Sequence, residues 1–139
     1  MTAFARATFA KWERIGIPRE GLPKAPLDAF ERDRGVVLPA SLRALWLLSD
    51  GTAAMDDDGF TFWPFDNIAD DPSLGPRAHP QAHLVFADWQ LQSRFLVLQL
   101  VDGSVDVLGA TGALRERSVA LSFDEFLDRY VHTPQTLVR

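Results

Sequence analysis

The strongest constraint on the fold is a change in the spacing of apolar residues along the chain. Before residue 50, apolar side chains recur every three or four positions, as on one face of a helix. Between residues 60 and 119 they alternate with polar ones in short runs, as in strands. From residue 122 to residue 132 the helical spacing returns. This order predicts an α+β domain in which helices pack on an antiparallel sheet.

Three helices are expected in the N-terminal part of the chain, over residues 3–15, 27–34 and 40–49. The Gly- and Pro-rich stretch 16–26 is expected to connect the first two, so that residues 1–25 form a helix and its connection. The Asp50-Gly51 pair is expected to cap the third helix at its C-terminus.

A strand is expected after that over residues 60–63, and three or four further strands over residues 83–88, 94–100, 104–108 and 114–119. Asp102-Gly103 and Ala110-Thr111-Gly112 have the composition of hairpin turns. The Pro-rich segment 64–82 is expected to be a long loop with one helical turn near Ile68. We therefore predict one sheet of about four to six strands.

The last helix has the clearest local signals. Ser122 and Glu125 have the spacing of a capping box, and Pro134 is expected to end the helix. The apolar face is expected to consist of Phe123, Phe126, Leu127, Tyr130 and Val131. With 139 residues, the whole chain 1–139 is expected to form a single domain.

Composition excludes several classes of function. The chain has no cysteine, which rules out disulfide scaffolds and thiolate zinc sites. The net charge of -5 argues against binding nucleic acid through its phosphates. Residues 1–10 lack the pattern of a secretory signal, and no apolar run is long enough to span a membrane. We expect a soluble, cytoplasmic protein.

Acidic residues gather in the middle third of the chain. Eight carboxylates stand there against one basic side chain, Arg77. They are Asp50, Asp56, Asp57, Asp58, Asp66, Asp70, Asp71 and Asp88. This segment is where a basic partner would be attracted.

The sequence contains no recognised catalytic motif, and we expect neither a metal nor a cofactor. Gly109 to Gly112 lies between predicted strands, which favours a hairpin turn over a phosphate loop. His79 and His83 are separated by Pro80, which breaks the helical spacing of a metal pair. The consecutive Asp56, Asp57 and Asp58 lack the alternation of a calcium loop and are expected to form a solvated acidic loop.

Aromatic residues of the predicted strands allow two interpretations. Phe60 and Phe62 alternate onto one face and are expected to be core rather than the wall of a ligand pocket. Trp63 and Trp89 each end a strand beside acidic residues. Each is either a core residue or an anchor in a protein interface, where tryptophan is enriched.

The order of these motifs resembles the SUKH superfamily, which comprises bacterial immunity proteins and fungal cell-wall synthesis regulators. The resemblance covers about residues 26–132. The matching pieces are residues 27–35, Leu38-Pro39-Ala40-Ser41-Leu42, Ser49-Asp50-Gly51, the strand 60–65 with Ile68, the runs 83–88 and 94–100, and residues 120–127.

The resemblance implies an α+β domain without a catalytic centre that binds another protein. For a bacterial member the implied function is immunity: stoichiometric neutralisation of a toxin, often a nuclease with a basic surface. The alternative is a regulatory or scaffold protein that binds a host protein, and an enzyme is a third, less favoured interpretation. The candidate partner-binding residues are Asp56, Asp57, Asp58, Trp63, Asp66, Asp70, Asp71 and Trp89.

Overall fold

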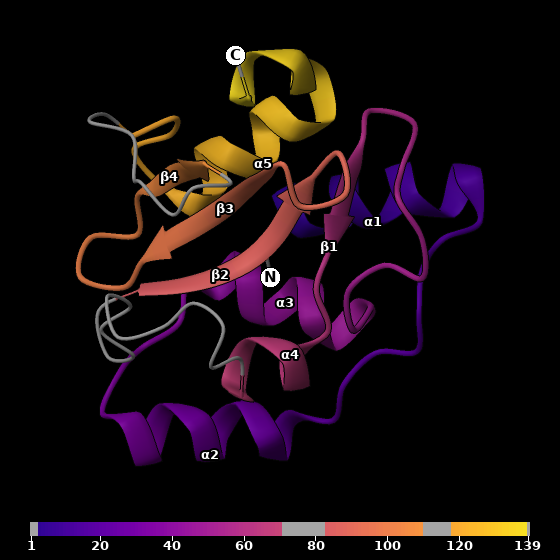
Figure 1. Cartoon of the computed structure of the whole chain (residues 1–139). Coiled ribbons are helices and arrows are strands. Elements are labelled where there is room, and N and C mark those ends of the chain that lie inside the picture. The colour runs from indigo at the N-terminus through magenta and orange to yellow at the C-terminus, as the bar shows by residue number, and fades with distance from the viewer. Residues whose placement is uncertain (1–2, 71–82, 110–117, 139) are drawn as a thin grey trace.

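The computed structural model describes residues 3–70, 83–109 and 118–138 of the chain (Figure 1). Within these ranges the helices are α1 (Ala3–Ile15), α2 (Lys24–Arg34), α3 (Ala40–Leu48), α4 (Phe65–Asp70) and α5 (Phe123–His132), which a 3-10 turn, Pro134–Leu137, follows. The strands are β1 (Phe60–Phe62), β2 (His83–Trp89), β3 (Arg94–Gln99) and β4 (Val105–Gly109). The predicted α+β class is confirmed.

The four strands form one antiparallel sheet in the order β1-β2-β3-β4. Phe62 lies opposite Ala87, Ala87 opposite Leu96, and Leu96 opposite Val107, so one row of buried side chains crosses the sheet. The register of β2 shifts between Val85 and Ala87, as in a β-bulge. The sheet is therefore a meander, as the alternating pattern predicts.

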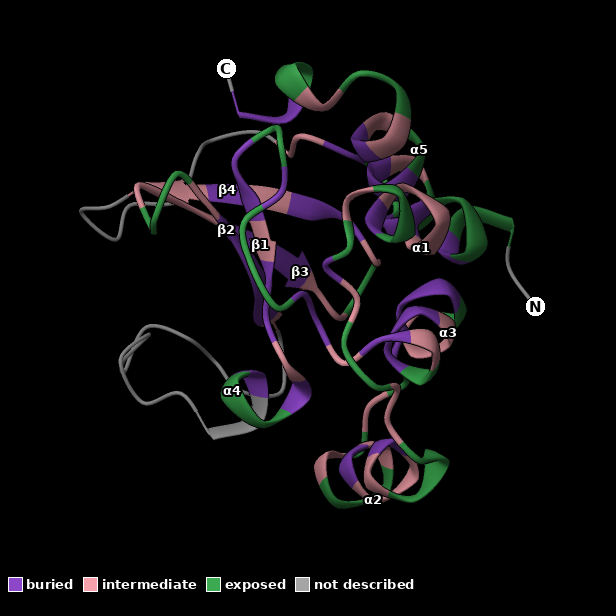
Figure 2. Cartoon of the chain, turned by 90° about the vertical axis from the view of Figure 1, so that its right-hand side faces the viewer, coloured by how far each residue is buried: buried purple, intermediate pink, exposed green. Residues whose placement is uncertain are grey.

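Helices α1, α3 and α5 lie together on one side of the sheet (Figure 2). Aromatic rings fill the space between these layers. The ring centroids of Trp12 and Phe62 are 5.0 Å apart, and the ring centroid of Phe86 in β2 lies 5.2 Å from those of Phe123 and Phe126 in α5. Phe60 and Phe62 are buried, which confirms the prediction that they belong to the core.

Two helix boundaries differ from the sequence prediction. Helix α2 begins at Lys24 rather than at residue 27, because Pro26 falls in its first turn, where no intrahelical N–H is required. Helix α3 ends at Leu48. Ser49 then turns to extended backbone, accepts from the N–H of Arg19 and donates its hydroxyl to the Gly51 carbonyl. The predicted cap at Asp50-Gly51 is therefore wrong.

Gly51 is required for a different reason. Its φ is +75°, and a Cβ there would lie 2.6 Å from the carbonyl oxygen of Phe62. The N–H of Thr52 donates to that same carbonyl at 2.9 Å. The chain thus passes close beside the end of β1, and only glycine fits.

The capping prediction for α5 is confirmed. The Ser122 hydroxyl accepts from the N–H of Glu125 at 3.0 Å. The Glu125 carboxylate accepts from the N–H of Leu121, one residue before the position that a capping box uses. Pro134 does not continue the helix and begins the 3-10 turn instead.

The predicted strand over residues 114–119 and the turn at Ala110-Thr111-Gly112 lie largely outside the described residues. Beyond that gap, Ala120 forms an isolated antiparallel bridge with Val105. None of the described helices is long and apolar enough to cross a membrane.

Candidate functional site

The acidic loop before β1 is held in place by a buried polar network. Asp56 is 5 % exposed, and one of its carboxylate oxygens accepts from the N–H groups of Asp58 and Phe60 at 2.8 and 2.9 Å. The other oxygen accepts from the hydroxyl of Tyr130, which in turn accepts from the indole N–H of Trp12 at 3.0 Å. Asp56 therefore links α1, α5 and the loop, and it is not accessible to a partner.

This network changes the ionisation of the phenol. Burial, together with the Asp56 carboxylate beside it, raises the pKa of Tyr130 far above its ordinary value. The hydroxyl is therefore a hydrogen-bond donor throughout the physiological range. This network serves structure, since the hydroxyl is fully used inside the core.

Lys11 of α1 fixes the loop from its outer side. Its ammonium group lies 2.9 Å from the Asp58 carboxylate, donates to the Tyr130 carbonyl at 2.8 Å and lies 3.8 Å from the centre of the Tyr130 ring. The Asp58 side chain is 40 % exposed to solvent. Asp57 is exposed and forms no ion pair with any described residue.

The turn between β2 and β3 lies against this loop. The Trp89 indole N–H donates to the Asp58 carbonyl at 3.0 Å, and the N–H of Gln90 donates to the Gly59 carbonyl at 2.8 Å. Figure 1 shows the two segments together at the same end of the sheet. We call Asp57, Asp58, Trp89, Gln90 and Leu91 the hairpin-tip surface.

The turn itself is conformationally strained. Gln90, Leu91 and Gln92 all have positive φ, at 51°, 54° and 71°. A left-handed residue with a Cβ costs about 1–2 kcal/mol, so natural turns favour glycine or asparagine there. Leu91 is nevertheless 80 % exposed at the apex. Backbone strain of this kind concentrates at functional positions.

Trp63 and Asp88 support the turn from the other face of the sheet. Trp63 is buried, and its indole N–H donates to Asp88 at 2.7 Å. The second oxygen of Asp88 accepts from the N–H of Gln92 at 3.2 Å. Trp63 also packs against Phe95 in an edge-to-face arrangement, with the two ring centroids 6.0 Å apart. Of its two interpretations, the geometry favours the core residue.

The remaining predicted acidic residues do not join the hairpin-tip surface. Asp66 is exposed in the first turn of α4 and forms no ion pair within the described ranges. It follows β1, whereas Asp57 and Asp58 precede it, so the two groups lie at opposite ends of that strand (Figure 1). The side chain of Asp70 and the whole of Asp71 lie outside the described residues. The acidic segment is therefore not one patch.

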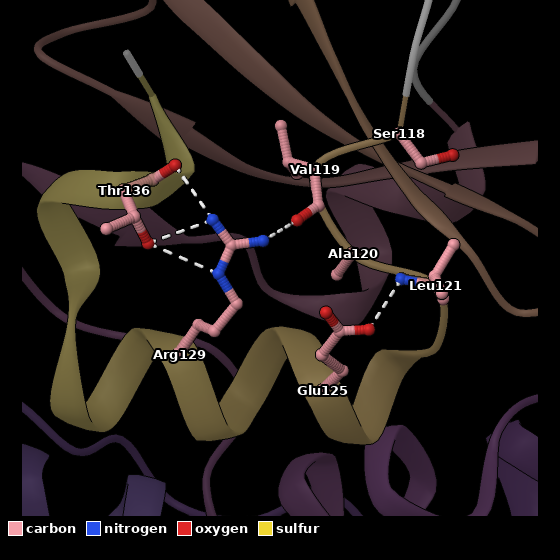
Figure 3. Close-up of a pocket in the computed structure, with 7 residues that line it drawn as sticks. All are labelled: Ser118, Val119, Ala120, Leu121, Glu125, Arg129 and Thr136. Atoms are coloured by element: carbon pink, nitrogen blue, oxygen red, sulfur yellow. Dashed lines mark hydrogen bonds between the residues drawn. The ribbon is translucent and has the colours of Figure 1, made fainter.

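A small polar pocket of about 190 Å³ lies beside α5 (Figure 3). Arg129 dominates it. Its guanidinium donates to the Val119 carbonyl, and to the Thr136 carbonyl and hydroxyl at 2.9 Å each. The Glu125 carboxylate on the same wall accepts from Leu121. These polar groups bind the chain to itself, so the pocket is a clamp that joins α5 to its flanking segments.

The described ranges contain no group of three or more His, Cys, Asp or Glu side chains that could hold a metal ion. His83 begins β2, and His132 lies exposed at the end of α5 beside Asp128, at 3.3 Å. His79 lies outside the described residues.

Sequence reasoning missed three residues of this region: Lys11, Tyr130 and Leu91. The helical spacing places Tyr130 on the apolar face of α5, but nothing local shows that its hydroxyl meets a carboxylate 74 positions away. Lys11 carries no signal in the sequence. For Leu91, the signal was an apolar residue between two glutamines directly after a predicted strand.

A comparison with curated proteins returns no match. The SMI1 / KNR4 family model (SUKH-1) matches residues 21–129, which include every described helix and strand except α1, the end of α5 and the 3-10 turn Pro134–Leu137. The resemblance to the SUKH superfamily is thereby confirmed. The chain therefore belongs to the SMI1 / KNR4 family (SUKH-1).

Proposed function

We propose that this protein is a non-catalytic binding protein, active in the cytoplasm, that neutralises a toxin by stoichiometric binding through the hairpin-tip surface. The observation that carries the proposal is Leu91, an aliphatic side chain exposed on three consecutive left-handed residues. A free protein gains nothing from this arrangement, whereas an interface gains a rigid apolar anchor. Membership of the SUKH-1 family supports protein binding as the general role.

The residues around Leu91 indicate the kind of partner. Trp89 is half-buried and hydrogen-bonded to the loop, so it offers a fixed aromatic edge at low entropic cost. Asp57 and Asp58 place two carboxylates beside it, and Lys11 pairs with one of them. An apolar centre with an acidic border suits a basic surface with an apolar recess, as a nuclease toxin would present.

The network beneath makes the surface rigid before binding. Asp56, Tyr130 and Lys11 hold the loop, while Asp88 holds the turn. A preformed surface loses little conformational entropy on association, which favours tight binding. The six aspartates expected from the sequence are not all required in this proposal, since the interface lies at one end of β1.

The test is a pull-down with tagged full-length protein from a lysate of its own source, with the Leu91→Asn variant in parallel. Asparagine tolerates left-handed backbone, so the variant is expected to fold. The proposal requires a stoichiometric companion that is lost at high salt or with the variant. That companion must also be toxic when expressed alone and harmless when co-expressed with the unmodified protein.

Two results would redirect the proposal. A companion that is not toxic and has an ordinary cellular role would favour the regulatory function. A toxic companion that the variant retains with unchanged affinity would keep the immunity function but move the interface away from the hairpin-tip surface.

A further inference from the structure

The cation directly behind the hairpin-tip surface is Lys11 of α1, whose side chain is only 13 % exposed. A lysine ammonium has three N–H donors. This one lies 2.9 Å from an Asp58 carboxylate oxygen, donates to the Tyr130 carbonyl at 2.8 Å and lies 3.8 Å from the centre of the Tyr130 ring. The three contacts occupy the ammonium inside the molecule, so Lys11 acts on a partner through Asp58 and not by direct contact.

Lys11 sets where the Asp58 side chain lies. The Asp58 backbone is held separately, since its N–H donates to the Asp56 carboxylate at 2.8 Å and its carbonyl accepts from the Trp89 indole at 3.0 Å. The carboxylate itself has Lys11 as its one ion-pair partner among the described residues. Without the ammonium, a side chain that is already 40 % exposed would be free to turn toward a partner.

Lys11 also sets the charge of the surface. Asp57 and Asp58 carry two negative charges and Lys11 cancels one, so one net negative charge remains. That charge belongs to Asp57, which is exposed and has no ion pair with any described residue. A second basic group that approached Asp58 would also approach the Lys11 ammonium behind it, and like charges there would repel it.

The position of α1 relative to the family match fits such a role. Helix α1 lies outside residues 21–129, which match the family model, whereas Asp57, Asp58 and Trp89 lie inside them. The surface is therefore held by an element that the match does not cover. Such an element can adapt a shared fold to one partner without changing the fold itself.

We infer that Lys11 determines which partners the hairpin-tip surface accepts: it holds the Asp58 carboxylate inward and cancels its charge, so that Asp57 alone pairs with a basic side chain of the partner. A partner with one basic side chain beside its apolar recess fits this surface, and a partner with two adjacent basic side chains does not. The inference rests on the proposed function, because it concerns the same surface.

Three variants separate charge from position. Lys11→Met keeps an unbranched side chain that suits a helix but removes the ammonium, so the negative charge of the surface rises from one to two. Asp58→Asn removes the same ion pair and lowers that charge to zero. The double variant returns it to one without the ion pair. Lys24→Met is the matched control, because it removes an exposed lysine of α2, at the opposite end of the molecule (Figure 1).

The first measurement uses the free ¹⁵N-labelled full chain. The probe is a nitroxide that carries an ammonium group, with a neutral nitroxide of similar size as reference. The ratio of their relaxation effects at the amides of Asp57 and Gln90 reports the local potential. We expect it to rise about 1.5-fold in Lys11→Met, to fall by about the same factor in Asp58→Asn and to return in the double variant, with no change in Lys24→Met.

Hydrogen exchange of the same samples measures position. The Asp58 amide donates to Asp56, and the Gln90 amide donates to the Gly59 carbonyl. Both amides should exchange at least threefold faster, relative to those of β3, in each variant that lacks the ion pair. Lys24→Met should again match the unmodified protein.

The second measurement is the binding kinetics of the companion captured in the pull-down. At low salt, Lys11→Met should associate about twofold faster and Asp58→Asn about twofold slower, and the double variant should associate at the unmodified rate. All three should dissociate at least threefold faster, because the surface is no longer held in advance. A residue that only stabilised the fold would not move the association rate in opposite directions.

The inference is overturned if Lys11→Met and Asp58→Asn shift the nitroxide ratio or the association rate in the same direction, or if amide exchange is unchanged. Failure of the proposed function gives a different pattern. The nitroxide and exchange results would then be as expected, but every variant would bind the companion at the unmodified rates. The companion would bind elsewhere, and Lys11 would have no part in selecting it.

Discussion

Removing the hydroxyl of Tyr130 is the most direct test of how the candidate surface is held. Tyr130→Phe keeps the ring, which lies 4.9 Å from the ring of Phe62 and 5.3 Å from that of Phe60. It removes the hydrogen bond to Asp56 and the one from Trp12. Trp12, Asp56 and Tyr130 are all buried, so bulk water does not reach the Asp56 carboxylate or the Trp12 N–H that loses its hydrogen bond.

The expected cost follows from these two bonds. A hydrogen bond to a charged group contributes about 2 kcal/mol and a neutral one about 1 kcal/mol, so the free energy of unfolding should fall by about 3 kcal/mol. With a urea m value of about 2 kcal/mol/M, the midpoint should fall by about 1.5 M while the m value is unchanged.

The assay is urea unfolding, with Asp56→Asn and the double variant measured beside Tyr130→Phe. Asparagine keeps an oxygen for the N–H groups of Asp58 and Phe60, so the cycle isolates the contact with the phenol. We expect a coupling energy of about 1–2 kcal/mol. A loss below about 1 kcal/mol for Tyr130→Phe, with no coupling, would refute this account of the network.

Two further predictions concern α5 and its tyrosine. The chain has a single tyrosine, and its pKa is raised in the folded state, so the unfolded chain releases the phenolic proton first, near pH 10. The free energy of unfolding should therefore fall as the pH rises above that value. Tyrosinate absorbance should appear only when the protein unfolds. A tyrosinate signal at pH 10 in protein that is still folded by circular dichroism would contradict this. Ser122→Ala should cost about 1 kcal/mol in urea unfolding because the Glu125 N–H loses its acceptor, whereas Ser122→Asp should be nearly neutral.

The features that the sequence predicts well are those with local causes. The cap of α5 and its apolar face depend on residues within one or two turns of each other, and both are confirmed. The burial of Phe60 and Phe62 follows from alternation along one strand. Such patterns require no knowledge of distant partners.

The features that the sequence did not resolve depend on distant contacts. Trp63 and Asp56 look like exposed candidates on paper, but partners 25 and 74 positions away bury them. The acidic segment is continuous in sequence, yet β1 separates its two ends in space. The predicted start of α2 is wrong because a proline such as Pro26 breaks a helix interior but is tolerated in the first turn of a helix.

The central claim is that a partner binds at the hairpin-tip surface, and a pair of charge reversals tests it most directly. Asp57→Lys and Asp66→Lys change the net charge equally, at exposed residues without ion pairs among the described ones, but at opposite ends of β1. The measurement is the association rate with the captured companion, at low and high salt. We expect Asp57→Lys to slow association at least tenfold at low salt and to flatten its salt dependence, while Asp66→Lys leaves both nearly unchanged. Equal effects of the two reversals, or no effect of Asp57→Lys, would contradict an interface at this surface.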